Sequence, residues 1–164
     1  VLTEVLRLIV DNNFYPQKTL KFMAFAGEEG GMLGSAEIAA DYKKRNIQVD
    51  GDLQLDMTNY KGDEFDVVIY NDNSGQAQNA FVGKLIDTYL KVPWEYERCG
   101  YGCSDHNSWN AQGFQATFPF EGDVTNPYYH TINDTLEKSG GNALHSMLFL
   151  KLAIAYMVEM DYLK

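Results

Sequence analysis

Apolar residues recur along the chain at two spacings, one typical of helices and the other typical of strands. Helical spacing predicts helices over residues 2–9, 32–45, 76–91, 105–111 and 142–160. Short apolar or alternating runs predict strands over residues 19–26, 53–56, 65–70, 94–98 and 116–120. The first helix should end near Asn12 and Asn13, ahead of Pro16.

Strands that alternate with helices indicate a layered α/β domain with a mainly parallel or mixed sheet. Residues 19–26 are apolar and end at Gly27, so we expect this strand to be buried on both faces of the sheet. The 164 residues can bury one core and are too few for two ordinary domains, so we expect a single unit.

The charge of the chain argues against nucleic acid as a partner. The formal net charge is -10 and the sequence offers no basic stripe, so it would repel a phosphate backbone. A membrane span is not expected either, because the longest apolar run, residues 147–158, is interrupted by Lys151 and is too short. The first residues carry no signal-peptide pattern, so a secretion signal would lie upstream or be absent.

The two cysteines, Cys99 and Cys103, flank a Gly-Tyr-Gly turn that would let the backbone bring their sulfur atoms together. We favour a local disulfide, and with it an oxidising compartment. The alternatives are two free thiols in a cytosolic protein or a zinc site, although no second cysteine pair exists to complete such a site.

Acidic residues stand where predicted strands end, which is where open α/β sheets place their sites. Glu28 and Glu29 follow the first predicted strand, and Asp56 ends the second. Adjacent carboxylates in a glycine-flanked turn repel each other, so a cation between them is expected. A solvated acidic loop is the alternative for a bare Glu-Glu pair, but Asp56 and a lone His130 in an aromatic loop favour a site.

These residue types suit a hydrolytic zinc site, because zinc accepts oxygen and nitrogen ligands and can keep one position open for water. One of the two neighbouring glutamates could bind metal while the other acts as base. His145 is interpreted as a packed or capping residue, and His106 could be either a ligand or a structural residue, so neither is assigned to the metal.

Four stretches in one order, residues 25–35, 53–60, 99–106 and 126–131, resemble the bacterial leucyl aminopeptidases of the M28 metallopeptidase family. The likeness spans the chain and is similar in particular to the secreted Vibrio-type enzymes with two zinc ions. It implies a three-layer αβα sandwich and an aminopeptidase. Such an enzyme releases N-terminal, preferably hydrophobic, residues from peptides with a free N-terminus, using a zinc-activated water.

The resemblance also implies roles for single residues. Glu28 matches the general base, Glu29 and His130 match ligands of one zinc ion, and Asp56 matches a ligand of the other. It further implies a Cys99–Cys103 disulfide beside an apolar pocket for the first substrate side chain. Tyr101 would lie near the scissile group, and the pocket would be lined by Met57, Phe118, Phe120 and Tyr129. Ordinary core packing is the alternative for these residues, above all for Phe118.

One departure from the family pattern concerns the segment before the Glu-Glu turn. The family places a zinc-binding His-x-Asp motif and a bridging carboxylate there, whereas residues 1–27 contain neither and Asp11 does not match the motif. We therefore expect residues 1–164 to be a partial M28 catalytic domain whose N-terminal half is missing and would be its partner. Related carboxypeptidases, glutaminyl cyclases and a non-catalytic binding module remain alternatives.

Overall fold

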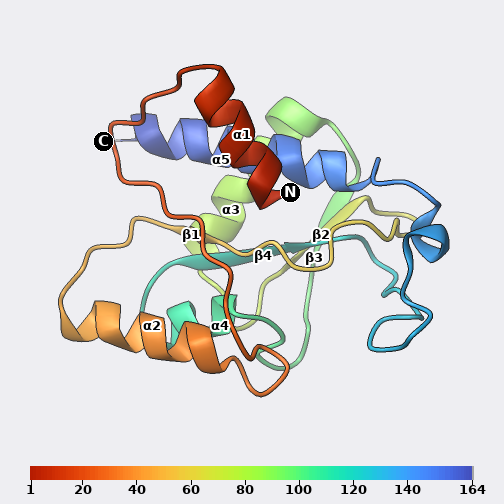
Figure 1. Ribbon diagram of the computed structural model, residues 1–164, viewed down its shortest axis with the longest axis horizontal. Helices are drawn as coiled ribbons and strands as arrows, with labels where there is room; N and C mark the ends of the chain where they lie inside the picture. Colours follow the sequence, from red (N-terminus) through yellow and green to blue (C-terminus); the bar gives the residue numbers. More distant parts are fainter. Residues whose placement is uncertain (164) are drawn as a thin grey trace.

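The computed structural model describes residues 1–163 and has three layers (Figure 1). Helices α1, α3 and α5 cover one face of a central sheet, and helices α2 and α4 cover the other. The predicted α/β sandwich is therefore confirmed. The helices are α1 (Leu2–Asp11), α2 (Leu33–Lys44), α3 (Gln76–Leu85), α4 (His106–Ala111) and α5 (Ser146–Tyr162).

Four strands form the sheet in the order β1-β4-β2-β3. Their bounds are β1 (Asp52–Leu53), β2 (Val67–Tyr70), β3 (Trp94–Glu97) and β4 (Ala116–Phe120). The pairs β1·β4 and β2·β3 are parallel, whereas β2·β4 is antiparallel, so the sheet is mixed. Strands β2 and β4 lie in the centre and are buried along their whole length.

Alternate residues of the central strands pack into different layers, as the period of two in a strand requires. Val67 and Ile69 of β2 face the α3 and α5 side, where Phe149 and Leu152 complete the core. Val68 and Tyr70 face the other side and pack with Phe118 and Phe120 of β4. These central strands fix the sheet on which the candidate site is built.

Several predicted elements have different bounds in the structure. The predicted helix 76–91 is α3 followed by a π-helical turn, η1 (Ile86–Leu90), and the predicted strand 53–56 is reduced to β1. A short 3-10 helix, η2 (Leu136–Ser139), had no counterpart among the predicted elements. The prediction of a helix over 142–160 is met by α5, which begins four residues later.

The prediction of a buried strand over residues 19–26 is wrong. This segment is irregular in the structure, and its residues alternate between exposed and half-buried positions. A strand needs a neighbour to satisfy its N–H and C=O groups, and the described residues offer no paired strand on this side of β1. The apolar pattern of this segment is typical of a buried strand, but such a pattern does not show whether a neighbouring strand is present to pair with it.

None of the helices in residues 1–163 is both long and apolar enough to cross a membrane.

Candidate active site

The two glutamates lie in a tight turn between residues 19–26 and helix α2. The turn is closed by hydrogen bonds from the N–H groups of Gly31 and Met32 to the carbonyl oxygen of Glu28, at 2.9 and 2.7 Å. Gly34 allows the helix start to approach the preceding segment, because a Cβ atom there would lie 2.8 Å from the Ala26 carbonyl oxygen. The sequence thus places Glu28 and Glu29 at the end of an extended segment and directly before a helix.

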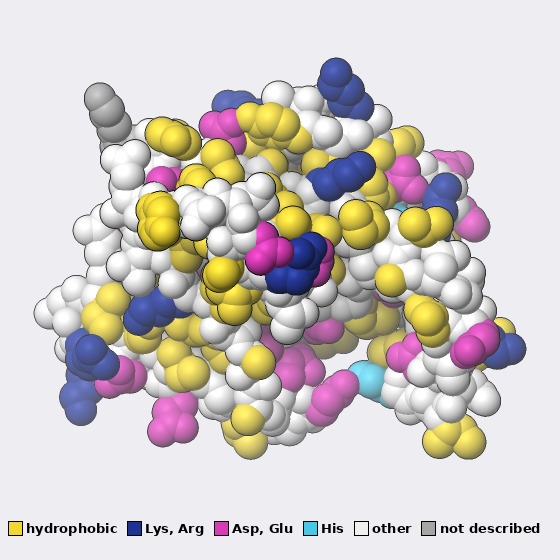
Figure 2. Space-filling view, turned by 45° about the horizontal axis from the view of Figure 1, so that its top comes forward, with side chains coloured by type: hydrophobic (Ala, Val, Ile, Leu, Met, Phe, Trp, Pro, Cys, Tyr) yellow, Lys and Arg dark blue, Asp and Glu magenta, His cyan; other side chains and the backbone are white. Residues whose placement is uncertain are grey.

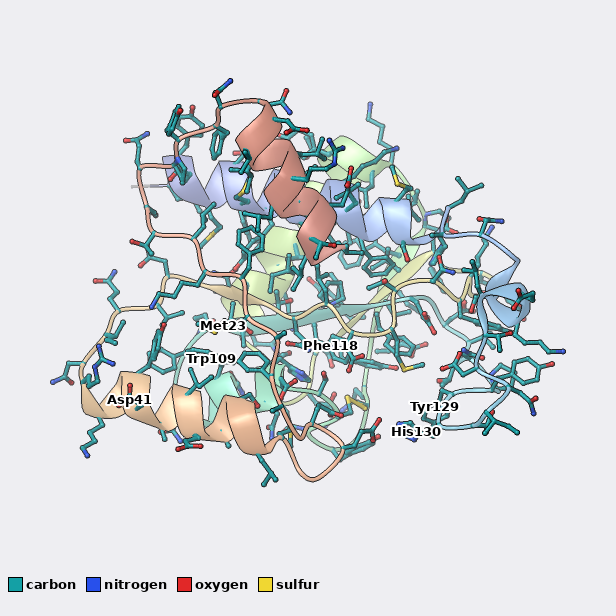
Figure 3. All side chains as sticks on the ribbon, in the orientation of Figure 1. Met23, Asp41, Trp109, Phe118, Tyr129 and His130 are labelled. Atoms are coloured by element: carbon teal, nitrogen blue, oxygen red, sulfur yellow. A yellow bond between two sulfur atoms is a disulfide. The ribbon has the colours of Figure 1, made fainter. Side chains whose placement is uncertain are left out.

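Glu29 contacts His130, which comes from a distant loop. Nε2 of His130 lies 2.6 Å from Oε1 of Glu29. Tyr129 and His130 project from the loop at the right of the sheet (Figure 3), and their rings lie 4.5 Å apart between centroids. In the space-filling view a His side chain lies beside a group of Asp and Glu side chains (Figure 2). The structure therefore joins two of the predicted metal ligands.

The backbone of His130 is in the left-handed region, with a φ of 61°. Residues other than glycine adopt this conformation rarely, and strain of this kind is found most often at functional sites. The turn is supported by the hydroxyl of Thr131, which donates to the carbonyl oxygen of Tyr128 at 2.6 Å. The loop thus holds the imidazole toward Glu29, and the left-handed backbone of His130 costs conformational energy.

Glu28 lies among other carboxylates. Partial burial is the main cause that raises the pKa of Glu28, and the charges of Asp56, Glu29 and Asp105 raise it further. His130 acts in the opposite direction. A carboxyl group whose pKa is raised in this way is a candidate acid or base.

Asp56 follows β1 and is held by a short hydrogen-bond chain. Its Oδ2 atom accepts a hydrogen bond from the hydroxyl of Ser104 at 2.8 Å, and Ser104 Oγ accepts one from the side-chain amide of Gln54 at 3.1 Å. Ser104 is fully buried. Glu28, Glu29 and Asp56 all line one cavity of about 1110 Å³, so the three predicted acidic site residues share a single space.

No three His, Cys, Asp or Glu side chains gather closely enough to hold a metal ion anywhere in residues 1–163. The predicted ligands Glu29 and His130 are in contact, while Asp56 stands apart beside Ser104. The assignment of Glu28, Glu29, Asp56 and His130 to catalysis and metal binding stays a prediction.

The predicted substrate-pocket residues fall into two groups. Met57, Phe118 and Phe120 pack together in one apolar cluster, and both Phe residues are buried. Tyr129 and Tyr101 are exposed, by 42% and 67%. The buried Phe residues act as core in this structure, which leaves Met57 and the two exposed Tyr side chains better placed to meet a ligand.

Cys99 and Cys103 form a disulfide, as the sequence analysis favoured. Both cysteines pack against the cluster that contains Phe118 and Phe120. The carboxylate of Asp72 accepts hydrogen bonds from the N–H groups of Cys99 and Gly100, at 2.9 and 2.7 Å, and anchors the start of the disulfide loop.

The two remaining histidines have structural surroundings. His145 lies at the start of α5, where its Nε2 atom is 2.8 Å from the carbonyl oxygen of Glu121. His106 is fully buried against Phe118, and burial lowers its pKa to about 4. That neither residue binds metal stays a prediction.

The sequence analysis did not identify the residues whose hydrogen bonds hold the site residues and nearby backbone in place. Ser104 holds Asp56, and Glu121 accepts hydrogen bonds from the N–H groups of Asn59 and Tyr60 at 2.8 and 2.7 Å. Both side chains reach segments far away in the sequence. No local pattern signals such contacts, although the position of Ser104 directly after Cys103 marks it as part of an ordered loop.

Comparison with known proteins gives a consistent result. The model of "Peptidase family M28" matches residues 1–155. A probable aminopeptidase of Saccharomyces cerevisiae, YDR415C, is 35% identical over 96% of this chain and 44% of its own length. Leucine aminopeptidase 1 of the fungus Arthroderma otae is 37% identical over 87% of this chain and 40% of its own length.

The same likeness extends to three-dimensional structure. The LapA aminopeptidase of Legionella pneumophila superposes with a TM-score of 0.89 at 35% identity, over 98% of this chain and 44% of that chain. The chain thus spans less than half the length of the relatives it matches. Both curated relatives named above are fungal, so the narrower resemblance to Vibrio-type enzymes stays a prediction.

Three findings agree on the family. A family model covers almost the whole chain, two relatives exceed 30% identity, and a solved structure superposes over nearly every residue. They also agree with the family that the order of the four sequence stretches predicted. The chain belongs to peptidase family M28.

Proposed function

We propose that this chain carries part of the active site of a zinc-dependent aminopeptidase that releases N-terminal, preferably hydrophobic, residues from peptides. The observation that carries the proposal is the contact between Glu29 and His130 directly beside Glu28. The names of the M28 relatives, which are called aminopeptidases or leucine aminopeptidases, support the same reaction.

The residues of the turn suit a cation chemically. Burial and the neighbouring carboxylates raise the pKa of Glu28, and a positive ion in the same space would relieve this repulsion. Carboxylate oxygen and imidazole nitrogen are ligands that zinc accepts. In our proposal Glu29 and His130 hold one zinc ion and Asp56 contributes to a second. Zinc bound there would supply Lewis-acid activation of the peptide carbonyl.

The proposed role of Glu28 is that of general base. Its carboxylate would accept the proton of the attacking water while Glu29 is committed to the metal. Ser104 would act as a positioning residue, since its hydroxyl fixes Oδ2 of Asp56 and leaves the other carboxylate oxygen free. The negative side chains around Glu28 would also attract the free ammonium group of a substrate.

We place the first side chain of the substrate next to Met57 and the disulfide loop. Met57 packs against the apolar cluster of Phe118 and Phe120, and the exposed ring of Tyr101 belongs to the adjoining loop. Tyr129 would lie on the other side of the substrate side chain, because its ring contacts that of His130 at a tilted angle. An apolar surface of this kind favours a hydrophobic N-terminal residue.

We further propose that the protein acts outside the cell. The Cys99–Cys103 disulfide supports this, because disulfides persist in oxidising compartments and are rare in the cytosol. Its substrates would be extracellular peptides with a free N-terminus.

A pair of chromogenic substrates tests the reaction. Protein that contains this chain should hydrolyse leucine p-nitroanilide but leave N-acetyl-leucine p-nitroanilide intact, and removal of zinc with a chelator should abolish turnover. Hydrolysis of both compounds would exclude an aminopeptidase. Release of a C-terminal residue, or cyclisation of an N-terminal glutamine peptide, would instead identify one of the rival activities.

A further inference from the structure

The loop that carries His130 has almost no buried side chain to fix its shape. Of residues 123–140, all of which the structure describes, only Asn126 is buried, with 4% of its surface exposed. A segment with few buried apolar contacts opens easily, so its conformation depends on its hydrogen bonds. We call residues 126–134 the His130 loop. The direction in which this loop holds the imidazole is therefore set by polar groups.

Asn126 makes three hydrogen bonds to residues on both sides of His130 in the sequence. Its Oδ1 atom accepts from the N–H group of Tyr128 at 2.9 Å, and its carbonyl oxygen accepts from that of Tyr129 at 3.2 Å. Its Nδ2 atom donates to Oδ1 of Asp134 at 2.8 Å. One buried residue thus joins the part of the loop before His130 to the part after it.

Further hydrogen bonds within the His130 loop close it into a compact turn. Thr131 donates from its N–H group and from its hydroxyl to the carbonyl oxygen of Tyr128, at 3.1 and 2.6 Å. The N–H group of Asp134 donates to the carbonyl oxygen of Thr131 at 3.2 Å. Pro127 fixes its own φ, which suits the first corner of such a turn.

The conformation of His130 needs this support. Its φ of 61° lies in the left-handed region, which a residue other than glycine keeps only where its surroundings hold it. Figure 3 shows Tyr129 and His130 side by side on the loop at the right of the sheet. The contact with Glu29 cannot hold the imidazole for metal binding, because in the proposed function both side chains are ligands and would release each other to bind the ion.

We propose that Asn126 is a positioning residue for the proposed metal ligand His130. Its side-chain hydrogen bonds to Tyr128 and Asp134 hold both ends of the turn, so that the imidazole stays directed at Glu29. Loss of this buried amide would leave its partners unpaired and let the loop open. The inference rests on the proposed function, because it gives Asn126 a part in the zinc site that Glu29 and His130 would form.

Two asparagines of the chain allow a matched test in full-length protein that contains it. Asn79 on α3 is 1% exposed and also uses its side chain twice, accepting from Thr117 Oγ1 at 2.7 Å and donating to Ser74 Oγ at 2.8 Å. We expect Asn126→Ala and Asn79→Ala to lower the unfolding midpoint similarly, since each removes the hydrogen bonds of a buried amide. Circular dichroism shows whether both variants fold.

Zinc affinity should separate these two variants. Competition with a fluorescent chelator should show a loss of about 10–100-fold for Asn126→Ala, the usual effect of removing support for a metal ligand, and no loss for Asn79→Ala. Parental affinity in folded Asn126→Ala would overturn the inference. Equal losses in both variants would overturn it as well, because they would trace the effect to stability alone.

Variants of Asp134 separate the hydrogen bond from the charge. Asp134→Asn keeps an oxygen that can accept from Nδ2 of Asn126, whereas Asp134→Ala removes it. We expect Asp134→Asn to bind zinc nearly as the parent protein does and Asp134→Ala to lose affinity in the same range as Asn126→Ala. The double alanine variant should lose no more than Asn126→Ala alone, because both changes remove one shared hydrogen bond. Equal losses with asparagine and alanine at position 134 would contradict the inference, since charge would then be the cause.

Amide exchange of the zinc-free protein distinguishes failure of this inference from failure of the proposed function. Asn126→Ala should speed exchange of the N–H groups in residues 128–134 by about 10-fold or more, with the amides of β2 as the internal control. If the parent protein binds no zinc, the proposed function fails, and exchange alone decides whether Asn126 holds the loop. Unchanged exchange in residues 128–134 would overturn the inference whatever the zinc affinities are.

Discussion

Nε2 of His130 lies 2.6 Å from Oε1 of Glu29, although Glu29 lies in the turn before α2 and His130 lies in the loop between β4 and η2. Glu28, the neighbour of Glu29, lies in the same turn, and burial with nearby carboxylates raises its pKa. Adjacent residues thus have different surroundings, one in contact with an imidazole and the other among carboxylates. This difference supports the separate roles that we propose for them.

Substituting the two glutamates separately tests those roles. In protein with a complete site, Glu28→Gln should lower turnover by roughly 10²–10⁴ because it removes a general base, while zinc content stays nearly unchanged. Glu29→Gln should instead lose zinc, because an amide is a poor replacement for a ligating carboxylate. Metal analysis of both purified variants, alongside anilide hydrolysis, checks the prediction. Reversed metal contents would mean that the roles are exchanged.

His130 combines a left-handed backbone with a proposed metal contact, and one substitution separates the two properties. Asparagine tolerates the left-handed region better than most residues, so His130→Asn should preserve the turn while removing the imidazole. We expect an unfolding midpoint close to that of the parent protein and a loss of zinc binding. Tyr129→Leu is a control that leaves the imidazole in place. Zinc binding by folded His130→Asn at parental affinity would exclude His130 as a ligand.

The fold was predictable wherever the signal is local. Helical periodicity located α2 and α4 to within one residue at each end, because a helix satisfies its backbone groups within its own segment. Strand β4 was also predicted with its observed bounds. Residues 19–26 have an equally strong apolar run, yet a strand depends on a neighbour that no local pattern describes.

The candidate site shows the same limit. The position of Glu28 and Glu29 at the end of an apolar run predicts a site from the sequence alone. Their contact with His130 depended on the path of a long loop and was suggested only by the family resemblance. The hydrogen bond from Ser104 to Asp56 links two segments through a buried hydroxyl, which no spacing in the sequence could indicate.

The disulfide should contribute modestly to stability. Cys99 and Cys103 are four residues apart, and a closed loop this short removes chain entropy worth only about 2 kcal/mol. We expect the double substitution of both cysteines by serine to lower the free energy of unfolding by about that amount in urea titrations. Thiol titration of the unfolded, unreduced parent protein should find no free cysteine. Two titratable thiols would remove both the disulfide and the main support for secretion.

Asp52 should make the stability of residues 1–164 depend on pH. Burial, together with the charge of Asp105, raises the pKa of Asp52 to about 7, whereas it titrates near 3.8 when unfolded. Between these values the unfolded state has lost a proton that the folded state keeps. Stability should therefore fall as pH rises from about 4 to 7, by at most about 4 kcal/mol.

The matched variant for this prediction is Asp52→Asn, which cannot ionise. Its free energy of unfolding should change much less between pH 5 and pH 8 than that of the parent chain, and it should be the more stable of the two at pH 8. Urea titrations at both pH values measure this. A parent chain that is equally stable at pH 5 and pH 8 would show that Asp52 is not held in its neutral form.

Residues 1–164 alone should bind zinc weakly and show negligible peptidase activity. Each zinc ion needs about three protein ligands, whereas in our proposal Glu29 and His130 would provide two for one ion and Asp56 one for the other. Loss of outer-shell support alone costs about 10–100-fold in metal affinity, so absent ligands should cost more. Zinc titration against a fluorescent chelator, with leucine p-nitroanilide hydrolysis in excess zinc, measures both properties. Glu29→Gln provides the background for each assay, and tight binding with robust turnover by the parent chain would mean that other residues complete the site.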